Sequence, residues 1–227
     1  MDHSAAIFAA ALSHERLALE FGIIMGIARL AFMQTQHALP PLRVDAVTGL
    51  VIGTRQVLSP HFDVRPSGVK PELIVVHGIS LPPGEYGGPW IDRLFTGNLP
   101  PDEHPYFRKI EGLRVSSHVV IRRDGEIVQY VSFNERAWHA GASQYRGRST
   151  CNDFSVGIEL EGADDQPYED AQYTQLASLI DALLKAYTTL KREHIAGHSD
   201  IAPGRKTDPG PAFEWPRLHK ELDRLAS

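Results

Sequence analysis

The chain has 227 residues, of which 42% are hydrophobic, and its formal net charge is −5. The normal apolar content excludes disorder over most of the length, and the acidic balance gives no support to a general nucleic-acid-binding surface. The single cysteine, Cys151, excludes an internal disulfide and a multi-cysteine metal site, and we expect it to be a small buried side chain. The eleven histidines direct attention to imidazole chemistry.

Residues 1–33 differ from the rest, and we expect them to form an N-terminal helical extension. Their apolar run, Leu17 to Met33, is interrupted by Glu20 and Arg29, whereas a membrane-spanning helix needs about 20 apolar residues. A secretory signal fits poorly, because an early basic region and a small-residue cleavage site are missing. Three interpretations stay open: an extra docked helix, an interfacial amphipathic helix, or sequence upstream of a true start at Met33.

Three further regions follow from the local composition. Residues 34–57 contain the proline pair Pro40 and Pro41 and lack helical periodicity, so we expect a wrapping arm with a short strand near Gly49–Val57. The main domain is expected at 58–220, and residues 221–227 are expected to be a C-terminal tail.

The main domain shows alternating strand and loop patterns. Leu73–His77 is a continuous apolar run, typical of a buried central strand. Ser80–Tyr106 is rich in proline and glycine and predicts long surface loops, which in a compact domain are more often functional than idle. Ser117–Arg122 and Glu126–Val131 flank a glycine-containing turn and predict a hairpin, and Phe154–Leu160 predicts another strand.

One helix stands out by its periodicity. Residues 171–187 place leucine and isoleucine at helical spacing, with Asp170 as the expected N-cap. Together these patterns predict an α/β fold with a mixed central β-sheet and packed α-helices.

Two segments carry residues suited to metal chemistry. His77 ends an apolar strand, which would mount it rigidly, although a half-buried histidine bonded to a carbonyl is the simpler interpretation. Residues 198–210 hold His198, Lys206 and Asp208, a composition that a solvated loop would also tolerate. In an extended chain Lys206 and Asp208 project to the same side. Imidazole and carboxylate together suit zinc, which in catalytic sites takes three protein ligands.

The strand near residue 159 offers a candidate acid or base. Val156, Ile158 and Leu160 alternate with Glu159 and Glu161, so the glutamates face away from the core, toward either a cleft or plain solvent. A glutamate beside an activated water can serve as general base and then as proton donor.

Two other histidine patterns are weaker. Glu193, His194 and His198 loosely resemble a zinc-protease helix, but the glutamate lies outside the histidine pair and Gly197 argues against a helix. His139, beside an aromatic residue and a glycine, is expected to contact substrate.

Five segments, in this order, carry a family resemblance: VVHGISLPPGEYGGPWI, LRVSSHVVIRRDGEIVQYV, RAWHAG, CNDFSVGIELEG and GHSDIAPGRKTDPGP. They resemble the AmpD family, the cytoplasmic 1,6-anhydro-N-acetylmuramyl-L-alanine amidases of Gram-negative cell-wall recycling. The likeness runs from about Leu58 to about Leu218. It implies that residues 58–220 are a zinc amidase domain with the fold shared with peptidoglycan-recognition proteins.

The resemblance also implies roles for individual residues. The family's zinc ligands fall on His77, His198 and Asp208. Its catalytic glutamate falls on Glu159, and the lysine that stabilises the developing oxyanion falls on Lys206.

Substrate contacts are implied at three further positions. Arg114 matches a basic position used for the peptide's carboxylates, and Trp138 and His139 match the strand that lines the groove. Two positions depart from the family: Gly78 replaces an asparagine often found after the first ligand, and Thr150 stands where a basic residue occurs.

The implied activity is zinc-dependent hydrolysis of the amide between (1,6-anhydro-)N-acetylmuramic acid and L-alanine of the stem peptide. The expected cofactor is Zn²⁺ and the expected partner is a small muropeptide, without nucleic acid or stable membrane insertion, in a cytoplasmic monomer. The alternatives are a non-catalytic peptidoglycan-binding module of the same fold, or an exported amidase acting on intact peptidoglycan.

Overall fold

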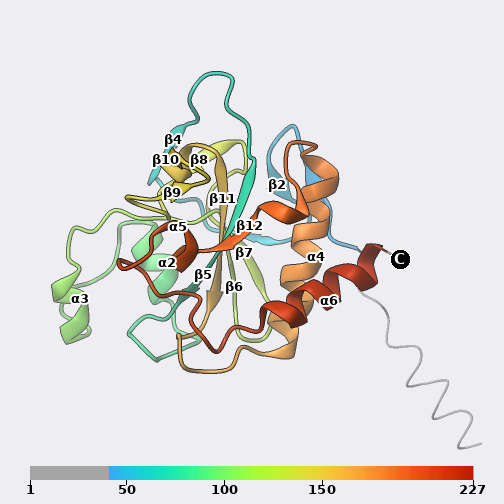
Figure 1. Cartoon of the computed structure of the whole chain (residues 1–227). Helices are drawn as coiled ribbons and strands as arrows, with labels where there is room; N and C mark the ends of the chain where they lie inside the picture. Colours follow the sequence, from blue (N-terminus) through green and yellow to red (C-terminus); the bar gives the residue numbers. More distant parts are fainter. Residues whose placement is uncertain (1–40, 227) are drawn as a thin grey trace, which may run out of the picture. The chain divides into compact units, whose positions relative to one another are not determined.

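The computed structural model describes residues 41–226, so the extension expected at 1–33 lies outside the described residues. Its central feature is a mixed sheet with strand order β12-β5-β11-β6-β7-β3 (Figure 1). The strands are β3 (Arg55–Gln56), β5 (Leu73–Ile79), β6 (Val119–Ile121), β7 (Ile127–Gln129), β11 (Ser155–Glu161) and β12 (Ile195–Gly197). This arrangement confirms the predicted α/β class.

Parallel pairing dominates the middle of the sheet. Strand β5 lies between β12 and β11 and is parallel to both, and β11 is also parallel to β6. The predicted hairpin is present as the antiparallel pair β6 and β7. In the β5–β11 register His77 lies directly opposite Glu159, so the topology brings these two residues together.

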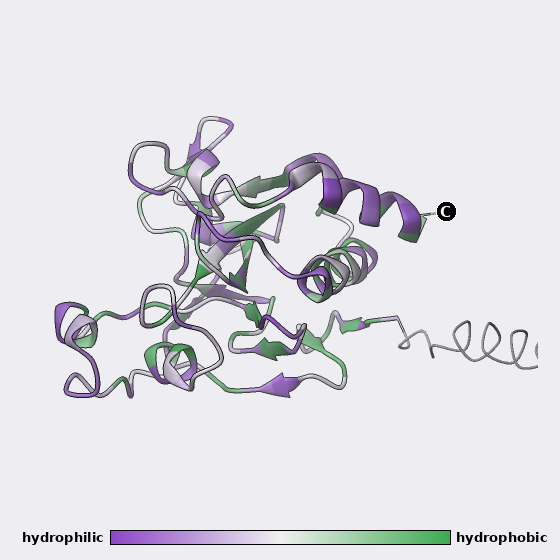
Figure 2. Ribbon diagram, turned by 90° about the horizontal axis from the view of Figure 1, so that it is seen from below, coloured by the Kyte–Doolittle hydropathy of each residue, from purple (hydrophilic) through white to green (hydrophobic). Residues whose placement is uncertain are grey.

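Helices cover the two faces of this sheet. Helices α4 (Asp170–Ala186) and α6 (Trp215–Ala226) lie on one side, and α2 (Trp90–Phe95) and α3 (Pro105–Lys109) on the other (Figure 1). On the α4 side, alternate residues of β11 pack against leucines of both helices. Figure 2 shows hydrophobic residues concentrated on the central strands and hydrophilic ones along α6.

Short elements surround the sheet. These are β1 (Val44–Asp45) paired with β2 (Leu50–Val51), β4 (Phe62–Val64) with β8 (Glu135–Ala137), β9 (Gln144–Tyr145) with β10 (Arg148–Ser149), the 3₁₀ turns η1 (Cys151–Asp153) and η2 (Arg192–His194), and α5 (His198–Ile201). No helix in the described residues is both long and apolar enough to span a bilayer.

Four details differ from the prediction. The strand expected near Gly49–Val57 is two short strands, β2 and β3, on either side of a turn. The loop expected at Ser80–Tyr106 contains α2, and α3 begins at its end, because proline marks the start of each helix. The N-cap of α4 is Glu169, whose N–H donates to the Gln172 side chain (3.0 Å), and Asp170 is the first helical residue.

The fourth difference concerns the C-terminal tail expected at 221–227. Helix α6 continues to Ala226, and Leu222 is buried against the core. A helix whose apolar side chains recur every three to four residues buries that face on the domain, and Leu218 and Leu222 follow this spacing.

Candidate active site

The candidate site lies where the carboxyl ends of the parallel strands meet. His77 sits near the end of β5, Glu159 on β11, and His198 begins α5 directly after β12. Asp208 comes from the loop that follows α5, here called the Asp208 loop (residues 202–210). Open α/β sheets bind ligands at this edge because side chains of neighbouring strands converge there.

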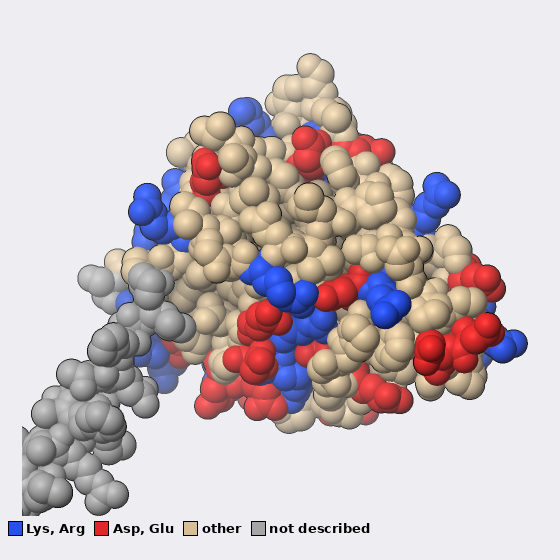
Figure 3. Space-filling view, turned by 180° about the vertical axis from the view of Figure 1, so that it is seen from behind, with Lys and Arg blue, Asp and Glu red and all other residues tan. Residues whose placement is uncertain are grey.

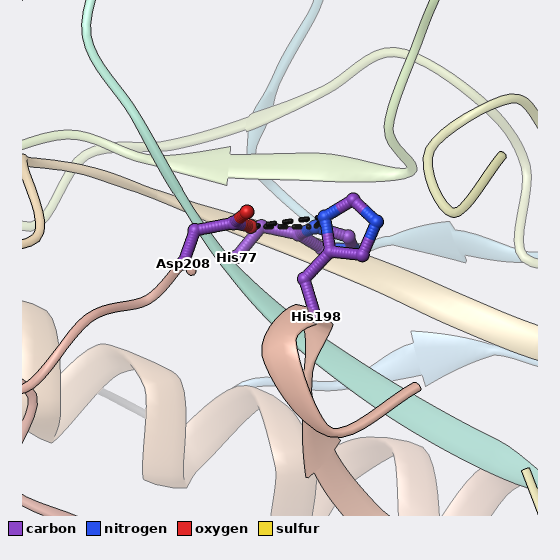
Figure 4. A group of neighbouring side chains, drawn as sticks. All are labelled: His77, His198 and Asp208. Carbon is purple, nitrogen blue, oxygen red and sulfur yellow. Dashed lines mark hydrogen bonds and ion pairs between the residues drawn. The ribbon is translucent and has the colours of Figure 1, made fainter. Parts of the chain in front are cut away.

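Three side chains point their ligand atoms at one another (Figure 4). The Nδ1 atoms of His77 and His198 lie 2.9 Å apart, and Asp208 Oδ2 lies 3.2 Å from the first and 3.1 Å from the second. Both histidines are almost completely buried. The structure thus brings together all three predicted metal ligands.

The donor set fits a metal ion. A tetrahedral zinc with bonds of about 2.0–2.1 Å separates its ligand atoms by about 3.3 Å, close to the spacing of these three atoms. Two imidazole nitrogens and one carboxylate oxygen form a typical catalytic zinc set that leaves the fourth position open. Three electron-pair donors that are buried this close together need either a metal ion or shared protons between them, because their lone pairs otherwise repel one another.

The far side of each imidazole has its own partner. His198 Nε2 lies 3.1 Å from the Ala140 carbonyl, and His77 Nε2 lies 2.9 Å from His139 Nδ1. His139 Nε2 in turn lies 3.1 Å from Ser155 Oγ. With Nδ1 of His77 and His198 facing the centre, their Nε2 atoms donate outward, as in most histidine–metal sites.

This chain of contacts gives His139 a place that the sequence did not predict. It borders the cavity but is only 9% exposed, and both ring nitrogens are engaged. A side chain at Gly157 would overlap its ring, so this glycine in β11 makes room for it. Glycine inside a strand was the available signal, since it marks a close approach.

Burial and hydrogen bonds set the charge states of His77 and Asp208. Burial lowers the pKa of His77 to about 4 and lowers that of His139 well below its usual value. Burial alone would raise the pKa of Asp208, but hydrogen bonds with His198 and His77 outweigh it and hold that pKa below its normal range. Neutral imidazole and ionised carboxylate are the forms that bind a metal.

Glu159 lies beside this cluster and has a raised pKa. Its Oε1 lies 4.0 Å from His77 Nδ1, and the side chain is nearly buried. Burial, and then the charge of Asp208, raise the pKa of Glu159 well above its usual value, while Lys206 opposes them. A carboxyl with a raised pKa can both accept and return a proton near neutral pH.

The cluster opens into a cavity of about 600 Å³ that includes Glu159 and the exposed Lys206. Its walls include the end of β5 with the residues that follow it (78–84), residues 162–164 after β11, and part of the Asp208 loop. Glu161, at the end of β11, lies outside this cavity: its carboxylate accepts from Arg122 (3.0 Å) and from the Gly87 N–H (2.8 Å).

The predicted substrate residues Trp138 and Arg114 differ in whether they border this cavity. Trp138 borders the cavity and is fixed by a bond from its indole N–H to Asp63 (2.7 Å). Arg114 does not border it; this exposed residue lines a neighbouring pocket of about 500 Å³, where Trp138 stacks on His61. Trp138 therefore lies between the two spaces.

The remaining candidates lie elsewhere. Cys151 is buried, as expected. His194 contacts Tyr145 (3.2 Å) rather than His198, so these two histidines do not form the metal pair of a zinc-protease helix. Near the second departure from the family, Arg148 pairs with Glu72 at the surface.

Comparison with known proteins shows which family the chain belongs to. Residues 67–211 match the family model described as N-acetylmuramoyl-L-alanine amidase. The chain is 62% identical over 170 residues to the 1,6-anhydro-N-acetylmuramyl-L-alanine amidase AmpD of Escherichia coli K12, covering 75% of this chain and 92% of the relative.

Solved structures of amidases also match this chain. A crystal structure of a selenomethionine AmpD derivative matches with a TM-score of 0.76 and 57% identity, covering 79% of this chain and 98% of the other. The amidase AmiD from E. coli, solved in complex with the substrate anhydro-N-acetylmuramic acid-L-Ala-D-gamma-Glu-L-Lys, matches with a TM-score of 0.50 and 30% identity, covering 69% of this chain and 60% of AmiD. This chain belongs to the N-acetylmuramoyl-L-alanine amidase family.

Proposed function

We propose that this chain is a zinc amidase that cleaves the bond between 1,6-anhydro-N-acetylmuramic acid and L-alanine of a muropeptide during cell-wall recycling. The observation that carries the proposal is the convergence of His77, His198 and Asp208 beside the buried Glu159, at the base of an open cavity. The identity with AmpD relatives and the muropeptide bound to AmiD support this choice of substrate.

In this proposal His77, His198 and Asp208 hold the ion. Zinc, when bound, polarises the scissile carbonyl and lowers the pKa of water toward neutrality. Two neutral imidazoles and one carboxylate leave a net positive centre, because only one of the two metal charges is compensated. This balance favours removal of a proton from water at neutral pH.

Glu159 moves the proton. As a carboxylate it accepts a proton from the attacking water, and it then delivers that proton to the L-alanine nitrogen as the amide C–N bond breaks. The products are the free lactyl carboxyl of the sugar and the free amino end of the peptide. The raised pKa of Glu159 suits both halves of this cycle.

Lys206 and the cavity walls orient the reacting amide. Lys206 faces the cavity from the Asp208 loop and would stabilise negative charge on the carbonyl oxygen in the transition state. Trp138 would pack on the substrate where the cavity meets the neighbouring pocket, and Arg114 would bind a carboxylate from the pocket side. His139 would act by holding His77.

We further propose that the protein is a cytoplasmic monomer that acts on small muropeptides, as the resemblance to the recycling amidases implies. The test is to incubate zinc-loaded protein with purified anhydro-muropeptide and, separately, with intact sacculi, and to measure released peptide in each. We expect rapid release from the muropeptide and little from sacculi. Efficient release from sacculi would instead indicate a wall-degrading amidase, and no release from either would indicate a binding module.

A matched variant connects the activity to the site. His198→Ala should lose both zinc and peptide release, because it removes a ligand. Stoichiometric zinc and full turnover in this variant would contradict the ligand assignment.

A further inference from the structure

Tyr168 lies beneath the candidate metal centre, on the segment that connects β11 to α4. It is 4% exposed, and its hydroxyl donates to the Pro209 carbonyl (2.9 Å). Its ring packs edge-on against Phe213 at a centroid distance of 5.6 Å. The hydroxyl is thus tied to the backbone directly after Asp208.

The same side chain presses on two glycines. A Cβ added at Gly78 would overlap the Tyr168 hydroxyl, and one added at Gly162 would overlap its ring, with Cζ only 2.9 Å away. Gly78 is not among the glycines with positive φ. Its lack of a side chain therefore serves the close approach of Tyr168 and not the backbone conformation.

The residues that Tyr168 contacts are neighbours in sequence of the candidate site residues. Gly78 follows His77 at the end of β5, Gly162 follows the end of β11 that carries Glu159, and Pro209 follows Asp208. The Asp208 loop has other supports, including the bond from Ser199 N–H to the Asp208 carbonyl (2.9 Å). Tyr168 is one side chain that contacts this loop and the ends of both β5 and β11.

We propose that Tyr168 is a positioning residue that sets Asp208 against the two histidines and thereby determines the metal affinity of the site. This inference rests on the proposed function in assuming that the cluster binds zinc. Asp208 alone among the three ligands comes from a loop, so its position depends on what holds that loop. Partners outside the ligand shell commonly control metal affinity in this way.

The test compares Tyr168→Phe with Tyr187→Phe. Tyr187 is the matched control because its hydroxyl also donates one hydrogen bond, to Asn134 (2.9 Å), from the same hydrophobic cluster but away from the site. Zinc dissociation constants of chelator-stripped protein are measured by competition with a chromophoric chelator. We expect Tyr168→Phe to bind zinc roughly 10-fold more weakly or worse, and Tyr187→Phe to bind like wild type.

Thermal unfolding of the metal-free proteins completes the comparison. Similar losses of Tm in both variants, with a loss of affinity only in Tyr168→Phe, would separate positioning from general stability. Equal zinc affinity in Tyr168→Phe and wild type overturns the inference and leaves the proposed function standing. Failure of the wild-type protein to bind zinc overturns both.

A second variant tests the contact with Gly78 independently. Gly78→Ala should displace the Tyr168 hydroxyl and weaken zinc binding. In the Tyr168→Phe background the new methyl would meet Cζ at 3.6 Å and Pro209 Cα at 3.5 Å, which are ordinary contacts. The alanine should then reduce affinity little further, so the two effects are non-additive. Full additivity would contradict a shared mechanism.

Discussion

Lys206 differs from the three metal ligands in being exposed and in taking no part in holding the ion. Lys206→Ala should therefore lower kcat by about 10²–10³, the usual effect of removing one oxyanion stabiliser. Zinc content should stay stoichiometric. Steady-state kinetics and metal analysis of the same preparation check both points, and loss of zinc together with turnover would place Lys206 among the structural supports of the centre.

His139 acts through its neighbour. Its Nδ1 lies 2.9 Å from His77 Nε2, so His139→Ala leaves a buried ring nitrogen without a partner and His77 free to turn. We expect zinc affinity to fall by about 10–100-fold, as for other partners outside a ligand shell. His194→Ala is the control, because His194 contacts Tyr145 instead. A weakened control or an unchanged His139→Ala would contradict this role.

At the scale of the elements, helix α6 contributes to the core up to its last turn. Leu222 is 3% exposed and Leu225 is 45% exposed. Leu222→Ala should destabilise the protein by about 2–5 kcal/mol, through lost burial and the cavity left behind, and Leu225→Ala by much less. Denaturant unfolding of both variants provides the measurement. Equal small losses would mean that residues 221–226 behave as the expected tail.

The strands and the main helix could be predicted from the sequence because each has its own periodicity. The apolar run ending at His77 and the alternation around Glu159 both describe strands whose register the structure then supplies. The assignment of His198 and Asp208 as ligands follows from the family resemblance, since the composition of residues 198–210 also permits a solvated loop. The position of His139 could not be predicted, because it depends on a contact with Gly157 across the sheet. Likewise the separation of Arg114 from the cavity depends on how residues 110–114 pack.

At the scale of the whole described part, charge is balanced locally. Acidic and basic side chains are intermingled on the face seen in Figure 3, in keeping with the modest net charge of −5. A small anionic ligand needs a few placed cations near the site and not a basic surface. Lys206 in the cavity and Arg114 in the neighbouring pocket are positioned to supply them.

Buried histidines also make the whole fold sensitive to acid. Burial, and then the charge of Arg65, lower the pKa of His118 to about 3. In the unfolded chain His118 is protonated below about pH 6.5, whereas in the folded chain it stays neutral down to about pH 3. The free energy of unfolding therefore falls as the pH falls through this window. Each such histidine contributes a slope of up to about 1.4 kcal/mol per pH unit.

Urea unfolding of the chelator-treated protein between pH 7 and pH 4 measures this slope. His118→Asn should lower stability at pH 7 and flatten the pH dependence. A slope that stays unchanged in this variant would assign the acid sensitivity to other groups.

The pairing of His77 with Glu159 across β5 and β11 has one more consequence. If these strands joined one residue out of step, the proton carrier would face the opposite side of the sheet from the ion, although the chain could still collapse and hide its apolar groups. Recovery of amide cleavage after refolding therefore reports correct strand alignment, which circular dichroism alone would not detect.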